Sequence, residues 1–278
     1  MVLKQDGTLW AMGSNGYGQL GDGTKNDKST PILVMTGVLA VSAGSMHTMI
    51  LKQDNSLWAT GDNNYGQLGD GTKNNKSTPI LVMTGVLAVS AGQNHTMILK
   101  QDGTLWATGY NRFGQLGTGD TINKSTPVQV MTGVLAVSAG SGHTMILKQD
   151  NSLWAMGSNT DGQFGDWTIT SRTTPVQVMT GVLTVSAGDR HTMILKQDNT
   201  LWATGYNYKG QLGDKTTIDK YIPVHIMSGV SAVSAGSYYT IILKQDGTVW
   251  ATGENYYGQL GDGTTINKST PIQVMPLP

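Results

Sequence analysis

Four histidines recur at one position of a 48-residue repeat, and histidine is a frequent ligand of metal ions. They are His47, His95, His143 and His191. A ring of imidazoles could hold a metal ion or an anion, but the next copy has Tyr239 at this position, which would break such a ring. We therefore interpret these histidines as structural and predict no metal site. His225 lies outside the pattern and is assigned no role.

Six tryptophans recur with the same spacing of 48 residues: Trp10, Trp58, Trp106, Trp154, Trp202 and Trp250. Large aromatic side chains at one repeat position predict structural packing in the core or between repeats. Trp167 stands outside this series. It replaces the glycine of a Gly-Asp-Gly-Thr motif, and we expect its side chain to be exposed.

The Gly-Asp-Gly-Thr motifs contain Asp22, Asp70 and Asp262, which could suggest calcium binding. An EF-hand loop needs oxygen ligands at alternating positions and a terminal Glu, and both are absent. Asp-Gly turns explain these motifs instead. The chain has no Ser–His–Asp arrangement beyond the repeated residues and no Walker-type lysine loop. The sequence therefore predicts a protein that is not an enzyme and needs no cofactor.

The composition excludes several classes of function. The formal net charge of the 278 residues is zero and both signs are interleaved, so there is no basic stripe for nucleic acid. Cysteine is absent, and no apolar run is long enough to span a membrane. Met1 leads directly into a strand-like segment, so we expect no signal peptide in this chain. A cytoplasmic and an exported location both remain open.

Each repeat has the pattern of four short β-strands. In one copy they are expected at residues 86–91, 95–101, 104–109 and 128–131. Asp102-Gly103 predicts a hairpin turn, and Pro127 is expected at the first position of the last strand. Helical periodicity is absent. The pattern predicts an all-β fold, a β-propeller of four-stranded blades built from six 48-residue repeats, as a single domain over residues 1–278.

These motifs resemble the regulator of chromosome condensation repeat. The shared elements are AG-x-x-HT, the DG-x-(L/V)-W hairpin and the GQLG motif, which stands at residues 18–21, 66–69, 114–117, 210–213 and 258–261, with GQFG at 162–165. The resemblance covers essentially the whole chain. It implies a β-propeller, usually with seven blades, and members that are mostly interaction platforms. It also implies that the repeated histidines hydrogen-bond the backbone of a neighbouring blade.

The repeats are not equally complete. The Trp strand occurs six times, but the VLAVSAG-type strand occurs five times, from Val38, Val86, Val134, Val182 and Val230. By analogy with other propellers, this small-residue strand is the innermost, so we expect the first blade to lack its inner strand. Six blades and part of a seven-bladed ring both remain open. The regular copying suggests recent duplication, as in bacterial repeat proteins.

Two short windows differ most between copies: the two residues between Ala-Gly and His-Thr, and the four residues after the Trp strand. Strands one and three of a blade run in the same direction, so both windows are expected on one face. The turns expected on the opposite face are nearly constant. Drift of exposed loops is the alternative explanation, but those constant turns are expected to be exposed too. The residues expected to bind a partner are Tyr17, Met46, Tyr65, Asn94, Tyr110, Arg112, Phe113, Asp161, Asp189, Arg190, Tyr206, Tyr208, Lys209, Tyr238, Glu254, Tyr256 and Tyr257.

We therefore predict a non-catalytic protein-interaction scaffold that binds a partner protein through the variable face. One branch of the similar family catalyses nucleotide exchange on the small GTPase Ran, so regulation of a small GTPase is an alternative. That branch uses an inserted wedge, whereas the Trp spacing here is constant. Another branch is a plant ultraviolet-B photoreceptor, but its chromophore tryptophans lie in the window before His-Thr, which here contains none. Glycan binding by the loops is a weaker alternative.

Overall fold

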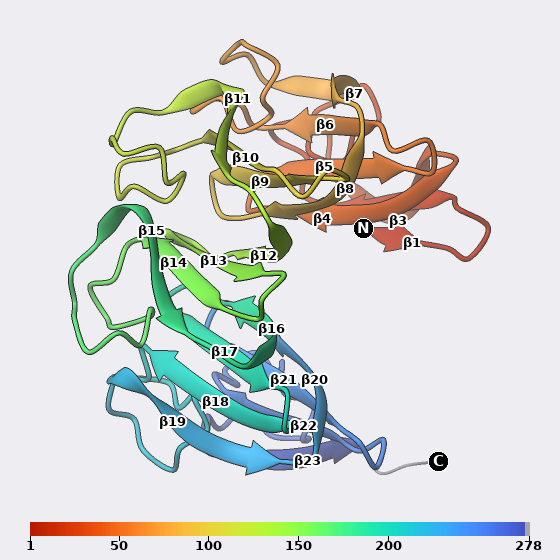
Figure 1. Ribbon diagram of the computed structural model, residues 1–278. Helices are drawn as coiled ribbons and strands as arrows, with labels where there is room; N and C mark the ends of the chain where they lie inside the picture. Colours follow the sequence, from red (N-terminus) through yellow and green to blue (C-terminus); the bar gives the residue numbers. More distant parts are fainter. Residues whose placement is uncertain (276–278) are drawn as a thin grey trace. The chain divides into compact units, whose positions relative to one another are not determined.

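The computed structural model describes residues 1–275, and all regular secondary structure in that part of the chain is β-strand. The strands form small antiparallel sheets made of consecutive stretches of the chain (Figure 1). Contacts divide the chain into two compact units, Met1–Ala139 and Gly140–Pro278. The all-β prediction is confirmed, and the expectation of a single domain over residues 1–278 stays a prediction.

The first unit contains the sheets β1-β2-β3, β4-β5-β6-β7 and β8-β9-β10-β11, followed by β12. Its strands are β1 (Val2–Leu3), β2 (Leu9–Gly13), β3 (Lys28–Met35), β4 (Val38–Ala43), β5 (His47–Lys52), β6 (Leu57–Gly61), β7 (Lys76–Met83), β8 (Val86–Ala91), β9 (His95–Lys100), β10 (Leu105–Gly109), β11 (Lys124–Met131) and β12 (Val134–Ala139). The first sheet has three strands, which confirms that the first repeat lacks the inner strand.

The second unit contains the paired strands β13-β14-β15 and the sheets β16-β17-β18-β19 and β20-β21-β22-β23. Its strands are β13 (His143–Lys148), β14 (Leu153–Gly157), β15 (Arg172–Met179), β16 (Val182–Ala187), β17 (His191–Lys196), β18 (Thr200–Gly205), β19 (Lys220–Ser228), β20 (Val230–Ala235), β21 (Tyr239–Lys244), β22 (Val249–Gly253) and β23 (Lys268–Met275). In both units the order of strands in a sheet follows the chain, as predicted for an up-and-down blade.

The central hairpin of each repeat turns at the predicted Asp-Gly or Asp-Asn pair, but the loop is longer than the two residues that the sequence predicted. In the second repeat the N–H of Lys52 donates to the backbone oxygen of Ser56, so Gln53, Asp54 and Asn55 all belong to the loop. In the second repeat, His47 to Leu51 pair in register with Gly61 to Leu57, and Asn55 in the turn has φ 62°. Asn tolerates this left-handed conformation better than most residues, so it can stand where other copies have Gly. Asp54 accepts hydrogen bonds from the backbone N–H and the hydroxyl of Ser56, and Ser56 in turn accepts one from Nε1 of Trp58.

The outer strand of each repeat is longer than the sequence pattern predicted. Strand β11 starts at Lys124, so Pro127 is its fourth residue, and the expectation that proline opens this strand is wrong. The strand lies at the edge of its sheet, where the missing N–H of proline is tolerated. Its register against β10 shifts between Ala107 and Gly109, as at a β-bulge.

The hydrophobic core lies between consecutive sheets within each unit. In the first unit, Met49 and Leu57 of the second sheet pack with Val86 and Ile98 of the third, and all four side chains are fully buried. Trp106 packs against this cluster. Complete burial of one such side chain contributes about 1.5–3 kcal/mol, so each pair of neighbouring sheets is held by several of them. Trp106 thus packs between the second and third repeats.

The Gly-Gln-Leu-Gly motif joins the loop of one repeat to the next repeat. The hydroxyl of Thr108 donates to the backbone oxygens of Gly66 and Lys124, at 2.8 and 2.7 Å. A Cβ on Gly66 would lie 2.5 Å from Cα of Ser125, so only glycine lets the loop approach the following outer strand this closely. The long loops are thus supported by the constant residues of their neighbours.

Candidate interaction surface

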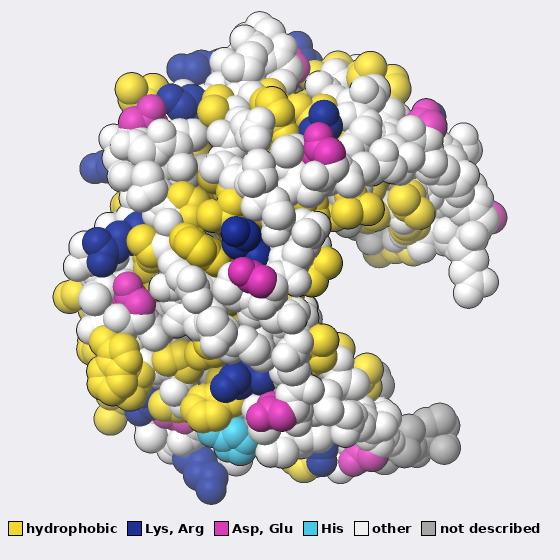
Figure 2. All heavy atoms as spheres, in the orientation of Figure 1, with side chains coloured by type: hydrophobic (Ala, Val, Ile, Leu, Met, Phe, Trp, Pro, Cys, Tyr) yellow, Lys and Arg dark blue, Asp and Glu magenta, His cyan; other side chains and the backbone are white. Residues whose placement is uncertain are grey.

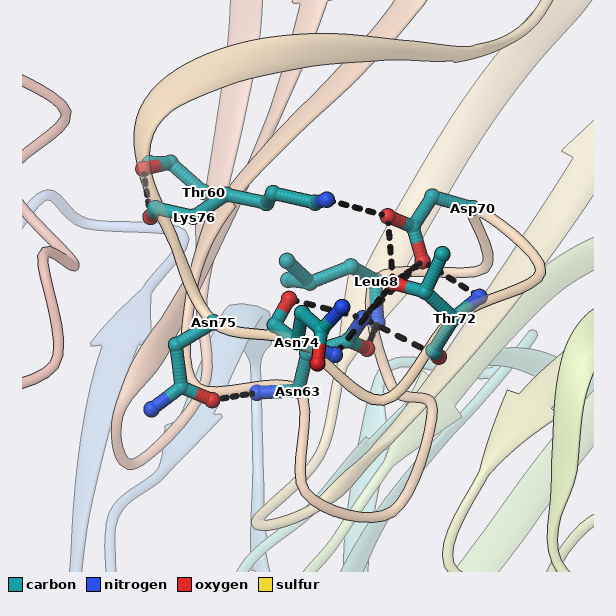
Figure 3. A network of polar contacts seen from close by, with 8 residues as sticks. All are labelled: Thr60, Asn63, Leu68, Asp70, Thr72, Asn74, Asn75 and Lys76. Atoms are coloured by element: carbon teal, nitrogen blue, oxygen red, sulfur yellow. Dashed lines mark hydrogen bonds and ion pairs between the residues drawn. The ribbon is translucent and has the colours of Figure 1, made fainter.

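A buried asparagine organises the long loop that follows each Trp strand (Figure 3). Asn63 donates from Nδ2 to Oδ1 of Asp70 at 2.9 Å and to the backbone oxygens of Thr72 and Asn74 at 3.1 and 3.2 Å. Its Oδ1 accepts a hydrogen bond from the backbone N–H of Leu68 at 3.0 Å. Because both ends of the buried amide have partners, this one side chain fixes the path of the loop.

The equivalent asparagine is fully buried in every repeat, at Asn15, Asn111, Asn159, Asn207 and Asn255. These residues belong to the variable window after the Trp strand, although none of them is among the residues expected to bind a partner. At this position the side chain does not face a partner, because the amide is used inside its own loop. A signal was available, since this is the one residue of the window that is identical in all six copies.

The aspartate of the Gly-Asp-Gly-Thr motif is the second anchor of the loop. Oδ1 of Asp70 accepts a hydrogen bond from the backbone N–H of Thr72, and Oδ2 lies 3.1 Å from Nζ of Lys76. Burial alone would raise the pKa of Asp70, but the hydrogen bonds from Thr72, Lys76 and Asn63 outweigh it and lower the pKa. Gly71 has φ 79°, so the predicted Asp-Gly turn is confirmed, and the carboxylate is used inside the loop.

The two variable windows of a repeat lie side by side, because a backbone hydrogen bond joins them. The N–H of the first residue after the Trp strand donates to the carbonyl of the residue before His-Thr. This bond links Asp62 to Met46, Tyr110 to Asn94, Ser158 to Gly142, Tyr206 to Arg190 and Glu254 to Tyr238, at 2.8 to 2.9 Å. The constant backbone therefore presents the variable side chains of both windows together.

In the first unit, three aromatic side chains of the windows form a cluster. The ring centroids of Tyr65 and Tyr110 are 4.7 Å apart, and those of Tyr110 and Phe113 are 6.2 Å apart. Tyr65 comes from the second repeat and the other two from the third, so the cluster bridges neighbouring repeats. Tyr65 and Phe113 are exposed, whereas Tyr110 between them is half-buried.

The other predicted residues of the first unit lie on the same loops. Tyr17, Met46 and Arg112 are exposed, and Asn94 is half-buried. Nε2 of Gln19 lies 3.8 Å from Sδ of Met46, so a loop of the first repeat touches a window of the second. The windows of successive repeats are therefore neighbours in this unit.

In the second unit, charged and aromatic residues of the windows form a connected series. Arg190 forms an ion pair of 2.8 Å with Asp161 and lies with its guanidinium carbon 5.1 Å from the ring centroid of Tyr206. The ring of Tyr206 lies 6.0 Å from that of Tyr238 and 6.4 Å from that of Tyr208. Asp161 is buried, so it holds Arg190 in position and does not itself face solvent.

The series continues along the last two repeats. Nζ of Lys209 lies 3.5 Å from a carboxylate oxygen of Glu254 and 5.8 Å from the ring centroid of Tyr208. Tyr256 and Tyr257 stack edge to face at 4.9 Å and are 70% and 83% exposed. Exposed tyrosines that already contact one another lose little conformational entropy when a partner covers them.

Burial shifts the pKa of two side chains in these windows. Burial raises the pKa of the half-buried Asp189 carboxyl, while the positive charge of Arg190 opposes this effect. Burial likewise raises the pKa of Tyr206, again against the charge of Arg190. Arg190 is thus the cation around which Asp161, Asp189 and Tyr206 are arranged.

The repeated histidines join neighbouring repeats through a threonine. Nε2 of His47 lies 3.0 Å from the hydroxyl of Thr96, which donates to the backbone oxygen of Gln67 at 2.7 Å. Burial lowers the pKa of His47 to about 4, so the ring is neutral. The histidine therefore contacts the neighbouring repeat, but its partner is the threonine hydroxyl and not the backbone that the resemblance implied.

The repeated tryptophans are half-buried, and each donates from Nε1 to the hydroxyl of the Ser or Thr two residues before it. A lysine lies over each ring, at 4.3 Å from the centroid for Lys4 over Trp10. Within residues 1–275, no three His, Cys, Asp or Glu side chains come together as a metal site requires. The part of the chain that the structure describes contains no helix that is long and apolar enough to cross a membrane.

Comparisons with known proteins match this repeat architecture. The family model of the regulator of chromosome condensation (RCC1) repeat matches residues 6–51, 54–99, 102–147, 150–195, 198–243 and 246–278. A second model with the same description matches five further ranges, from 38–67 to 230–259.

Three solved structures show the same fold at low sequence identity. Human WBSCR16 has 22% identity and a TM-score of 0.88, and the alignment covers 99% of this chain and 78% of that one. Yeast RCC1 (Prp20) bound to Kap60 has 18% identity and a TM-score of 0.67, over 99% and 85% of the two chains. Prp20p from Saccharomyces cerevisiae, reported with its binding properties to Gsp1p and histones, has 19% identity and a TM-score of 0.67. The alignment covers 99% of this chain and 88% of that one.

Proposed function

Because this chain belongs to the regulator of chromosome condensation repeat family, we propose that it is a non-catalytic β-propeller protein that binds a partner protein through its variable windows. One observation carries this proposal. In both units, the variable side chains project from a frame of constant hydrogen bonds and contact one another across neighbouring repeats. A rigid frame that presents varied side chains is suited to recognition, because few groups need to be ordered on binding.

The residue types of the windows support a protein partner. Tyrosine and arginine are enriched among the residues that contribute most binding energy at protein interfaces. Tyr208, Tyr256 and Tyr257 are exposed at 67%, 70% and 83%, and Lys209 and Glu254 pair beside them. A mixture of exposed aromatic and paired charged groups is typical of an interface that forms between separately folded proteins.

The test is a comparison of partner capture by the protein and by a quadruple variant. Tyr206, Tyr208, Tyr256 and Tyr257 are replaced by serine, and the captured proteins are quantified by mass spectrometry. The matched control replaces the exposed Gln149 and Gln197 of the hairpin turns by alanine. We expect at least one protein to be captured by the parent and by the control, and to be reduced about tenfold by the quadruple variant. Equal capture by all three proteins contradicts the proposal.

Regulation of a small GTPase is the second candidate. It is supported by the similarity in fold to Prp20p, whose structure is reported with its binding to Gsp1p. The constant spacing of the repeated tryptophans shows that no wedge is inserted between Trp10 and Trp250. Nucleotide release from a panel of small GTPases, measured with a fluorescent GDP analogue, tests this candidate. Faster release from one GTPase supports it, and unchanged release from all of them removes it.

A further inference from the structure

The fourth repeat has an unusual residue at the tip of its long loop. Trp167 stands where four other repeats have Gly23, Gly71, Gly119 and Gly263, and it keeps the left-handed backbone of those glycines, with φ 67°. A bulky side chain in this conformation is unfavourable. The indole is also 79% exposed, so no packing within the described residues compensates for it.

A second departure faces the first. The N–H of Trp167 donates to the backbone oxygen of Tyr221 at 3.1 Å, and Tyr221 lies at the position occupied by serine in four of the other repeats. The same hydrogen bond joins Gly71 to Ser125 at 2.8 Å. The backbone hydrogen bond that joins Gly to Ser in other repeats therefore joins Trp167 to Tyr221 here. Figure 2 shows hydrophobic side chains exposed on the surface of the molecule. Trp167 and the exposed Ile169 both belong to the loop that leads into β15.

Tyr221 is held by the loop beneath it. A Cβ on Gly162 would lie 2.3 Å from Cδ1 of Tyr221, so the ring rests directly against this glycine. Tyr221 nevertheless remains 48% exposed. One exposed aromatic side chain from the fourth repeat and one from the fifth therefore stand at a common backbone contact.

The charged residues of this loop are arranged differently as well. Four other repeats pair the loop aspartate with the lysine that opens the outer strand, as Asp70 pairs with Lys76 at 3.1 Å. In the fourth repeat the lysine is replaced by Arg172, and within residues 1–275 Arg172 and Asp166 form no ion pair. Oδ1 of Asp166 accepts hydrogen bonds from Asn159 and Thr168, while the buried Nε of Arg172 has no partner there.

Asp166 and Arg172 nevertheless belong to one site. Asn159 binds Asp166 through Nδ2 at 3.1 Å, and its backbone N–H donates to the hydroxyl of Ser171, the residue before Arg172, at 3.2 Å. Asp166 also directly precedes Trp167. The loop tip therefore combines two exposed aromatic rings with a hydrogen-bond acceptor, Asp166, and a hydrogen-bond donor, Arg172. These two charged residues do not form an ion pair with each other.

We propose that Trp167, Tyr221, Asp166 and Arg172 form a binding site for a neutral carbohydrate. A hydroxyl group both donates and accepts hydrogen bonds. One hydroxyl of a sugar can therefore donate to the carboxylate of Asp166 while a neighbouring hydroxyl accepts from the guanidinium of Arg172. The apolar C–H face of the sugar ring packs on the flat indole and phenol rings. An acidic ligand would satisfy Arg172 and be repelled by Asp166, and a basic ligand would do the reverse.

The experiment measures binding of four neutral oligosaccharides, cellohexaose, xylohexaose, maltohexaose and chitohexaose, by saturation-transfer NMR and calorimetry. The variants restore the residues of the other repeats: Trp167→Gly, Tyr221→Ser and Arg172→Lys. Each is expected to fold, because its new residue occupies the same position elsewhere in the chain. The matched control is Lys215→Gly, which changes the equivalent position of the next repeat, where φ is 70°.

We expect at least one oligosaccharide to bind, with affinity reduced about tenfold or more by Trp167→Gly and by Tyr221→Ser. Arg172→Lys is expected to weaken binding because the new lysine can pair with Asp166. Lys215→Gly should leave affinity unchanged. Absence of binding by all four sugars, or equal binding by the parent and Trp167→Gly, overturns the proposal. A decaproline peptide serves as a further probe, and its binding to the parent but not to Trp167→Gly would identify a peptide site instead.

Discussion

At the scale of single residues, the repeated histidines are held neutral by their surroundings. The hydroxyl of Thr96 donates to the oxygen of Gln67, so it accepts from His47, and the proton of the neutral ring is placed on Nε2. Nδ1 of His47 is buried without a donor partner in the described residues. His143 and His191 have the same arrangement in the second unit. A proton added to any of these rings would be a buried charge without a partner.

This arrangement predicts a loss of stability in mild acid. Burial lowers the pKa of His47 to about 4 and that of His143 to about 3, against about 6.5 in the unfolded chain. Between these values the unfolded state binds more protons, so acid favours unfolding. Stability is complete above about pH 6.5 and decreases as the pH falls toward 4, by about 3 kcal/mol for each histidine.

Urea unfolding followed by tryptophan fluorescence at several pH values between 7 and 4 measures this decrease. The variant His47→Gln should show a shallower dependence on pH, because one titrating group is removed. Loop aspartates such as Asp70 have lowered pKa values and so contribute only below about pH 4, outside this window. An unchanged slope in His47→Gln would show that this histidine does not govern the acid response.

The buried asparagine gives a second prediction at this scale. Asn63→Ala removes all hydrogen bonds of a fully buried amide and leaves buried backbone groups unpaired, so we expect a loss of about 2–4 kcal/mol in the free energy of unfolding. Asn74→Ala in the same loop is the control, because its side chain is exposed and a change within about 0.5 kcal/mol is expected. Equal effects of the two substitutions in urea unfolding would contradict the anchoring role.

At the scale of elements, the loop of one repeat depends on the outer strand of the next. Gly66 and Gly71 of the same loop both have positive φ, 84° and 79°. A Cβ on Gly66 would meet the backbone of Ser125 at 2.5 Å, whereas a Cβ on Gly71 would meet only a methyl of Thr126 at 3.6 Å. The two glycines therefore separate the cost of a left-handed backbone from the cost of displacing a neighbouring strand.

This pair predicts unequal effects of alanine. Gly71→Ala should cost about 1 kcal/mol, the usual penalty of a left-handed alanine. Gly66→Ala carries the same penalty and an additional 1–3 kcal/mol or so for overpacking against β11. Thermal unfolding of both variants measures the difference. If the two midpoints fall equally, the close approach of loop and strand contributes nothing beyond the backbone conformation.

Repetition explains what could be predicted from the sequence at this scale. The positions of the hairpin turns and the missing first inner strand follow from short-range patterns that recur several times in the chain. The position of Pro127 within β11 was not predicted, because the strand extends beyond its apolar residues by pairing Gly109 with Lys124 across a bulge. The contacts between windows were not predicted either, since Arg190 meets Asp161 only through the packing of neighbouring repeats.

At the scale of the whole chain, repeats that contact only their neighbours need not be equally stable. Strands β2 and β6 have nearly the same sequence but different surroundings. In β6, Thr60 donates to the backbone oxygen of Gly18 in the preceding repeat, and both Thr60 and Gly61 are buried. The corresponding Met12 and Gly13 of β2 are exposed, and β2 pairs on its inner side with only the two residues of β1.

We therefore expect local opening of the first sheet at lower free energy than that of the second. Hydrogen exchange followed by mass spectrometry reports this opening, and peptides covering Leu9–Gly13 and Leu57–Gly61 are well matched because their intrinsic exchange rates are similar. The first peptide should exchange faster, whereas Leu105–Gly109, whose burial resembles that of β6, should behave like the second. Slow exchange of Leu9–Gly13, equal to that of the other two, would show that β2 is as well protected in solution as the complete sheets.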